Sequence, residues 1–234
     1  LSLFFFSTQS HSQMQMSVDP KTSEIKYDVI GTVTNLKGRV YRQSGPRTKE
    51  QEIGLKFGVK KSDIITTTKD SYVQIKMIDS TTITLSENSR FSFKDFTYKT
   101  KVDREVQYNL AMGKTRIHVP IKVEQGAIKL NTRTASFGVR GTKFLVNQQY
   151  DKDGTSLEQL AVLNGQVEII ARGKKPSKML NVRDHYLLEA KKTGEEEDHF
   201  KKLSEKKHEK LLATNVQDGN RYFLENQSAQ EFID

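Results

Sequence analysis

The chain has 234 residues and a formal net charge of +9 at pH 7, and it contains no cysteine. The absence of cysteine excludes disulfide frameworks, thiolate metal sites and cysteine nucleophiles, and no run approaches the roughly 18 apolar residues that a membrane-spanning helix needs. Only 35% of the residues are hydrophobic, which indicates either a small core beneath a heavily charged surface or an ordered core with a polar tail.

The chain begins with a short apolar run, Leu1 to Phe6, followed by small and polar residues through Ser12. This order is typical of the end of a secretory signal, with small residues flanking the cleavage site. We therefore expect residues 1–12 to be a truncated signal segment, and the chain to be periplasmic or otherwise exported. The alternative is an apolar terminal strand or a buried tail. Residues 13–28 predict a polar linker.

Apolar and polar residues alternate in short segments across residues 29–190, which is typical of β-strands. A turn is expected at Asp79-Ser80, and Asn164-Gly165 is the strongest two-residue hairpin signal in the chain. His118 is expected to point outward. We expect an all-β domain, a β-sandwich or β-roll of many short, mostly antiparallel strands. The residues expected to face its core are Val73, Ile75, Met77, Ile83, Leu85, Phe91, Phe93, Thr115, Ile117, Val119 and Phe144.

Residues 191–234 change in character. Thr193 and Glu196 have the spacing of a capping box, and acidic residues precede lysines in the order that the helix dipole favours. We therefore predict a charged, mostly solvated helix from about residue 194 to 213, followed by a tail that is weakly structured or forms a second short helix. His199 and His208 lie on this helix, and we expect both to be solvated.

The positive charge belongs to the β region, because residues 31–190 carry 28 basic and 16 acidic side chains, a net charge of +12. One basic cluster lies near Phe96 and Tyr98 and is a candidate contact patch; the alternative is that these side chains belong to solvated loops. The candidate patch consists of Lys94, Lys99, Lys101 and Arg104. Two further clusters are Lys56/Lys60/Lys61 and Arg172/Lys174/Lys175/Lys178.

The segment from Gly138 to Phe144, GVRGTKF, resembles the signature of the FecR-like domain, the periplasmic module of ferric-citrate-type regulators. Four further blocks follow the order of that family, and the resemblance covers about residues 31–188. One departure is Ser62, where the family usually has glycine. The further blocks are the 73–85 hairpin, Asn88-Ser89, Leu110 to Lys114 and Val162 to Val167. The motif residues are Gly138, Val139, Arg140, Gly141, Thr142, Phe144, Gly113 and Gly165.

This resemblance implies an all-β exported module that works by contact with other proteins. In the best-known members the domain relays a signal between an outer-membrane transporter and a cytoplasmic sigma factor. Those members also carry an anti-sigma segment and a membrane helix, neither of which is found in this sequence. The resemblance therefore implies only the exported domain for this chain and not the relay role, and we expect a stand-alone member of the family.

The GVRGTKF segment also has a direct physical interpretation. Gly138 and Gly141 flank two residues, which predicts a tight kink or bulge between two strands. The role of Arg140 stays open. Its guanidinium is expected to satisfy strand-end carbonyls or a carboxylate such as Asp63 or Asp79; the alternative is contact with a ligand or partner.

Sequence motifs for catalysis are missing: there is no metalloprotease HExxH, nucleophile elbow or phosphate loop. Asp151 to Gly154 resembles only the start of a calcium loop and favours a β-turn. We therefore expect no enzymatic activity, no cofactor, no metal and no small-molecule substrate. Two functions remain: a protein-interaction, scaffold or signalling module that binds another envelope protein, or a domain that binds a polyanion such as lipopolysaccharide, a cell-wall polymer or nucleic acid.

Overall fold

The computed structural model describes residues 16–18, 25–100, 103–122, 124, 127–171, 177–190, 196–202 and 204–213. Within these residues the chain forms many short strands and one helix, α1 (Glu205–Ala213). The predicted all-β fold is confirmed. None of the described helical residues forms a segment long and apolar enough to cross a membrane. The predicted signal segment, residues 1–12, lies outside the described residues.

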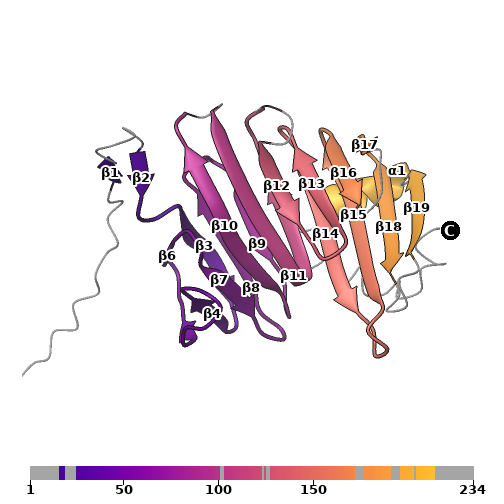
Figure 1. Cartoon of the computed structure of the whole chain (residues 1–234). Helices are drawn as coiled ribbons and strands as arrows, with labels where there is room; N and C mark the ends of the chain where they lie inside the picture. Colours follow the sequence, from indigo (N-terminus) through magenta and orange to yellow (C-terminus); the bar gives the residue numbers. More distant parts are fainter. Residues whose placement is uncertain are drawn as a thin grey trace, which may run out of the picture.

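The strands form two layers, and the chain advances from one end of the molecule to the other as it builds both (Figure 1). In order of pairing, the first layer contains β6 (Gly58–Val59), β3 (Gly31–Lys37), β8 (Tyr72–Met77), β9 (Thr82–Leu85), β11 (Arg104–His118), β14 (Lys143–Tyr150), β15 (Ser156–Asn164), β18 (Asp184–Ala190) and β19 (Glu196–Lys202).

The second layer is built in the same direction. In order of pairing it contains β5 (Gln51–Glu52), β4 (Val40–Gln43), β7 (Ile64–Thr67), β10 (Arg90–Tyr98), β11, β12 (Ile128–Asn131), β13 (Ala135–Val139), β16 (Val167–Ala171) and β17 (Lys178–Leu180). Among the described strands, only β11 and β12 pair in parallel, so the expectation of mostly antiparallel strands is confirmed.

Strand β11 belongs to both layers. Its first part pairs with β10 and β12, and the part from Gly113 onward pairs with β9 and β14. At Gly113 the backbone φ is +90°, and a Cβ built there would collide with Ser89. Glycine is the residue that tolerates both conditions, so Gly113 lets one strand pass from one layer to the other.

The core lies between the layers and follows the predicted alternation. Each of the eleven residues expected to face inward has at most 2% of its surface exposed, from Val73 to Phe144, and His118 is exposed as expected. Phe91, Phe93 and Tyr108 form an aromatic cluster with ring centroids 5.3–5.8 Å apart. The inward faces of both layers therefore share one apolar cluster.

Asn164-Gly165 does not form the predicted hairpin. Strand β15 pairs with β14 and β18 in the first layer, whereas β16 pairs with β13 and β17 in the second. The two-residue turn therefore carries the chain from one layer to the other. By contrast, the turn at Asp79-Ser80 joins β8 and β9, which do pair as a hairpin.

Part of the predicted linker is ordered as a strand pair. Strands β1 (Met16–Val18) and β2 (Ile25–Tyr27) pair antiparallel and form a separate two-stranded sheet. Tyr27 lies with its ring centroid 5.8 Å from that of Tyr98. This aromatic contact joins the hairpin to the β10 end of the second layer. Within the predicted polar linker, residues 16–18 and 25–27 therefore form strands.

The C-terminal helix is shorter than predicted. Residues Glu196–Lys202 form β19 at the edge of the first layer, because pairing with β18 outweighs the local helical preference. Lys202 accordingly bridges to Asp184 of β18, at 2.7 Å. The helix begins after Ser204, whose hydroxyl accepts a hydrogen bond from the Lys207 N–H, while the predicted cap, Thr193, lies outside the described residues.

Two titratable side chains are buried, and one of them, His208, was expected in solvent. His208 of α1 is only 8% exposed, since the helix packs on β15; burial lowers its pKa, as does nearby Arg183. Lys114 on β11 is 6% exposed beside Asn147 of β14. Burial lowers the pKa of Lys114 to about 8, and Glu87 opposes that shift.

We expect Phe144→Ala to destabilise the protein by about 3–5 kcal/mol, because truncating a buried aromatic ring leaves a cavity. Phe144 is 1% exposed and sits beside Ile117 and Val162 in the neighbouring strands. Urea titration measures this change. The control is Leu55→Ala, at a residue that is 62% exposed, which should change stability by no more than about 0.5 kcal/mol.

Lys114 should make stability depend on pH. Its pKa of about 8 in the folded protein lies below the ordinary lysine value of 10.5, so between these values the unfolded chain binds more protons and stability rises with pH. Relative to Lys114→Met, the wild-type protein should gain on the order of 2 kcal/mol between pH 7.5 and 10. Urea titrations of both proteins at several pH values measure the difference; a pH-independent difference contradicts the assignment.

Candidate functional site

An open hollow of about 660 Å³ lies where the chain passes repeatedly between the two layers. Lys122 follows β11, and Arg140 and Gly141 connect β13 to β14. The remaining lining residues come from the β15–β16 and β17–β18 connections and are Asn164, Gly165, Gln166, Asn181 and Val182. Each of these three connections leads from one layer to the other, which brings them to the same end of the strands.

Two glycines of the motif allow these connections to stack closely. Gly141 has a φ of +60°, and a Cβ built there would lie 2.8 Å from the Cγ of Lys122. Gly165 has a φ of +82°, and its added Cβ would lie 2.6 Å from the carbonyl oxygen of Gly141. Both the backbone conformation and the close approach require glycine. The stem of Lys122 therefore rests on Gly141, which in turn rests on Gly165.

Thr142 holds the stacked connections in place. Its side-chain hydroxyl donates to the carbonyl oxygen of Gln166 at 2.7 Å, and its own carbonyl accepts from the Val119 N–H at 2.8 Å. The Arg140 N–H donates to the Thr142 hydroxyl at 3.3 Å. Thr142 is fully buried. Its hydroxyl joins the Arg140 loop to the β15–β16 turn, and its backbone carbonyl holds the end of β11.

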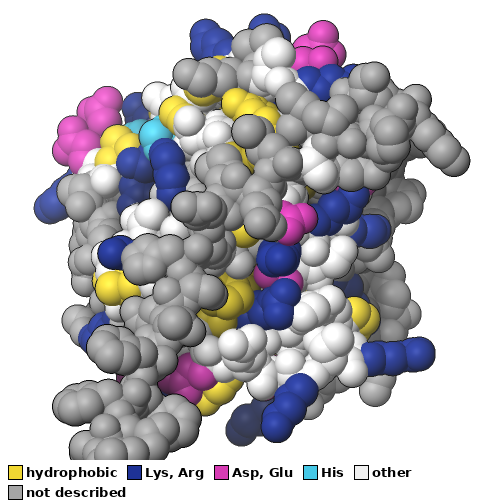
Figure 2. Space-filling view, turned by 90° about the vertical axis from the view of Figure 1, so that its left-hand side faces the viewer, with side chains coloured by type: hydrophobic (Ala, Val, Ile, Leu, Met, Phe, Trp, Pro, Cys, Tyr) yellow, Lys and Arg dark blue, Asp and Glu magenta, His cyan; other side chains and the backbone are white. Residues whose placement is uncertain are grey.

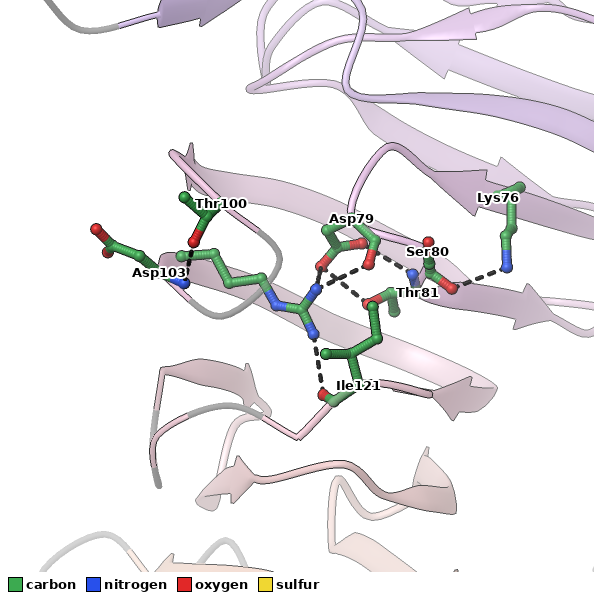
Figure 3. A network of polar contacts seen from close by, with 8 residues as sticks. Lys76, Asp79, Ser80, Thr81, Thr100, Asp103 and Ile121 are labelled. Atoms are coloured by element: carbon green, nitrogen blue, oxygen red, sulfur yellow. Dashed lines mark hydrogen bonds and ion pairs between the residues drawn. The ribbon is translucent and has the colours of Figure 1, made fainter.

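Arg104 supports the site from beneath. Its guanidinium lies 3.4 Å from the Asp79 carboxylate, with both side chains fully buried, and it donates to the backbone oxygens of Asp79 at 2.8 Å and Ile121 at 3.2 Å (Figure 3). Thr81 donates to both carboxylate oxygens of Asp79, through its backbone N–H and its hydroxyl, each at 2.9 Å. Because Ile121 immediately precedes Lys122, this buried pair fixes the backbone that carries Lys122.

Arg140 does not form the carboxylate pair proposed for it from the sequence. Asp63 is paired with Arg42 at 2.7 Å, and Asp79 with Arg104. Arg140 is exposed and faces the hollow. Within the described residues, neither its guanidinium nor the Lys122 ammonium has a hydrogen-bond or ion-pair partner.

The described lining of the hollow carries two cations, Lys122 and Arg140, and no acidic residue. Burial lowers the pKa of Lys143, the residue after Thr142, and Arg116 lowers it further. Burial also lowers the pKa of His118, with further contributions from Lys143, Lys76 and Arg116. These shifts show that Lys76 of β8, Arg116 of β11 and Lys143 of β14 lie close together around His118.

The predicted basic contact patch is not reproduced as a unit. Arg104 is 3% exposed and belongs to the buried network, so its assignment to a surface patch is wrong. Lys94 and Lys99 are exposed, while Lys101 lies outside the described residues. In Figure 2, which looks onto the end formed by the early strands, basic side chains drawn in colour are dispersed among acidic and neutral groups.

The two other basic clusters noted in the sequence do not form part of the hollow in the described residues. Lys56, Lys60 and Lys61 are exposed, but Lys61 pairs with Asp95 at 2.7 Å, and that hydrogen bond is the largest cause of the lowered pKa of Asp95. In the last cluster, Lys178 belongs to β17, whereas residues 172–176 lie outside the described part of the chain.

The motif residues divide into two groups. Gly138, Val139 and Phe144 are buried within strands, and Gly113 lies at the point where β11 changes layers. Only the connecting residues, Arg140, Gly141 and Gly165, line the hollow. The expected tight kink after Gly138 is confirmed in the form of the passage from β13 to β14.

Sequence reasoning missed Lys122, Asn181 and Val182 as site residues. Lys122 lies eighteen residues before Arg140 in an unremarkable stretch, and its proximity depends on where β11 ends. Asn164 and Gln166 were within the family-like block but carried no chemical signal. The one sequence feature that could have indicated Asn164 and Gln166 was their position on either side of Gly165 in a predicted turn.

Gly141→Ala should destabilise the protein by about 1–2 kcal/mol, because alanine is strained at positive φ and its Cβ would displace Lys122. The matched control is Gly54→Ala, since a Cβ at Gly54 would meet open space; that variant should be neutral or slightly stabilising. Thermal and urea unfolding measure both. Equal effects of the two substitutions would contradict the stacked arrangement.

Two crystal structures of a candidate anti-sigma factor from Parabacteroides distasonis ATCC 8503 share 17% sequence identity with the chain, with a TM-score of 0.49 in each case. The similarity covers 64% of this chain and 64% and 63% of the two solved chains. This chain thus spans less than two thirds of those relatives. The search of curated proteins gave no match.

The comparison with protein families matches residues 63–182 to the family described as FecR protein. This segment is just over half of the chain. It begins at the buried Asp63 and ends at Val182 on the rim of the hollow, and it contains every motif residue from Gly113 to Gly165. The chain therefore belongs to the FecR protein family.

Proposed function

We propose that the chain is an exported, non-catalytic protein-interaction module of the bacterial envelope that acts in signalling, with the hollow at Lys122 and Arg140 as its contact surface. Export is supported by the apolar run at Leu1 to Phe6, which has the order of a secretory signal. Membership of the FecR family supports a signalling or regulatory role.

The observation that carries this proposal is the position of Arg140. The motif places an arginine at a tight, hydrogen-bonded connection, yet its side chain is exposed and has no partner within the described residues. A purely structural arginine in this position would be expected to satisfy buried carbonyls or a carboxylate, as Arg104 does. An unpaired cation on a concave surface is a feature of recognition sites, where arginine is enriched.

Binding of a long polyanion has less support from the described surface. Of the four residues of the predicted patch, Arg104 is buried. Such binding would depend steeply on ionic strength, because it releases the counterions of the polymer. A protein interface with a central contact region depends on salt far less.

Photo-crosslinking in the source bacterium tests the proposal. A photoreactive residue placed at Val182, on the rim of the hollow and 37% exposed, should give one discrete adduct with an envelope protein, recovered in the exported fraction. The same residue placed at Leu55, which is 62% exposed and lies outside the hollow, is the control and should not give that adduct.

Three results would contradict this function. One is a chain that stays in the cytoplasm and retains its first six residues. Another is an adduct that appears equally from both positions. The third is an adduct with nucleic acid or polysaccharide in place of protein, which would favour the polyanion function instead.

A further inference from the structure

We propose that the hollow binds a carboxylate group carried by an extended segment of a partner protein, with Arg140 and Lys122 as the two binding cations. This inference rests on the proposed function, because it specifies the chemistry of the partner at the same site. The carboxylate can belong to an acidic side chain or to a chain terminus, and the experiment below separates these two sources.

Charge complementarity is the first argument. Among the described residues, two cations line the hollow and no acidic residue does. The nearby Asp184 does not neutralise them, because its carboxylate accepts from the Asn181 N–H at 2.6 Å and pairs with Lys202 at 2.7 Å. Within the described lining the positive charge is thus uncompensated, and an anionic group from outside would balance it.

Preorganisation is the second argument. The stem of Lys122 is supported by Gly141, its backbone is held through the bond from Arg104 to Ile121, and the backbone of Arg140 is bonded to Thr142. These supports reduce the entropy that binding would cost. A guanidinium can bind both oxygens of a carboxylate, which adds geometric specificity to the charge attraction.

The remaining lining residues favour a peptide over a lone anion or a charged polymer. Gln166 donates through Nε2 to Asn181 Oδ1 at 2.8 Å, which leaves the side-chain oxygen of Gln166, Oε1, as an acceptor and the side-chain NH₂ group of Asn181 as a donor. Such groups match the N–H and C=O groups of an extended main chain. Val182 adds an apolar surface, and the volume lies within the roughly 300–1,000 Å³ of typical ligand sites, more than one small ion fills.

Four probes test this on the purified full chain. Two are hexapeptides that each carry carboxylate from one source: alternating glutamate and valine with an amidated end, and alternating glutamine and valine with a free carboxyl end. The third is the glutamine peptide with an amidated end, which has no carboxylate. The fourth is sodium tripolyphosphate. Binding is followed by the amide chemical shifts of Gly141 and Gly165 in NMR titrations at about 0.1 M salt, where long-range attraction is screened.

Matched variants separate the site from general positive charge. Arg140→Gln and Lys122→Met remove the two cations, and Arg39→Gln and Lys94→Met remove exposed cations outside the hollow. All four positions are exposed, so each variant should fold, which circular dichroism checks. We expect at least one carboxylate peptide to bind, and Arg140→Gln to weaken it at least about tenfold, while the two control variants change it less than about twofold.

Several outcomes would overturn the inference. These are binding of neither carboxylate peptide at millimolar concentration, equal binding of the peptide without a carboxylate, equal losses in the control variants, or binding of tripolyphosphate alone. Repeating the Val182 crosslink in the Arg140→Gln and Lys122→Met double variant separates the two proposals. If the envelope-protein adduct persists undiminished, carboxylate recognition is refuted and the interaction function stands; if it was absent from the wild type, the function itself fails.

Discussion

Strand β11 is the element on which the rest of the structure depends, because it is hydrogen-bonded in both layers. It can do this only if its backbone bends sharply within a continuous strand, and Gly113 supplies the bend where Ser89 leaves no space for a side chain. The start of the strand is held by the buried pair of Arg104 and Asp79. A buried ion pair is costly to break, since removal of one partner leaves the other charge buried and uncompensated. The same pair binds Ile121 beyond the far end of β11.

The candidate site is a consequence of how the chain changes layers. Each passage between layers needs a sharp turn, and Gly141, Gly165 and Arg183 all adopt positive φ at these turns. When the turns stack, the side chains on them are brought to one surface. Lys122 and Arg140 stay exposed and hydrated, so leaving them without partners costs little stability. The fold can therefore keep two cations available at a rigid surface.

The C-terminal segment shows how a sheet edge can override a local preference. Residues 196–202 carry the charge pattern of a helix, yet they pair with the edge of the first layer along the whole of β18. A short solvated helix is marginal in water, whereas the open edge of β18 offers a full row of backbone partners. The helix forms only from Glu205, after the edge has been covered, and it then packs through His208.

The sequence by itself determined which residues build the core and which family the chain resembles. Side-chain direction in a strand alternates with period two, so Val73, Ile75 and Phe144 could be placed inside from local pattern alone. The alternation of side chains does not show which strands pair with each other. Asn164-Gly165 looks like a hairpin in isolation, and only the choice of β14 and β18 as partners of β15 turns it into a passage between layers.

The tertiary structure likewise determined which charged side chains are buried in ion pairs and which stay exposed. Arg104 and Lys99 are both basic residues near the same turn in the sequence, but one is buried against Asp79 and the other is exposed. The sequence offered Asp63 and Asp79 as partners for Arg140. In the structure each forms an ion pair with a different arginine that is distant from it in the sequence: Arg42 and Arg104. Which cation is neutralised and which stays free depends on long-range register and on the desolvation that goes with it. Local sequence specifies neither the register nor the desolvation. The motif could therefore be recognised from the sequence, whereas the proposed binding surface became visible only in the structure.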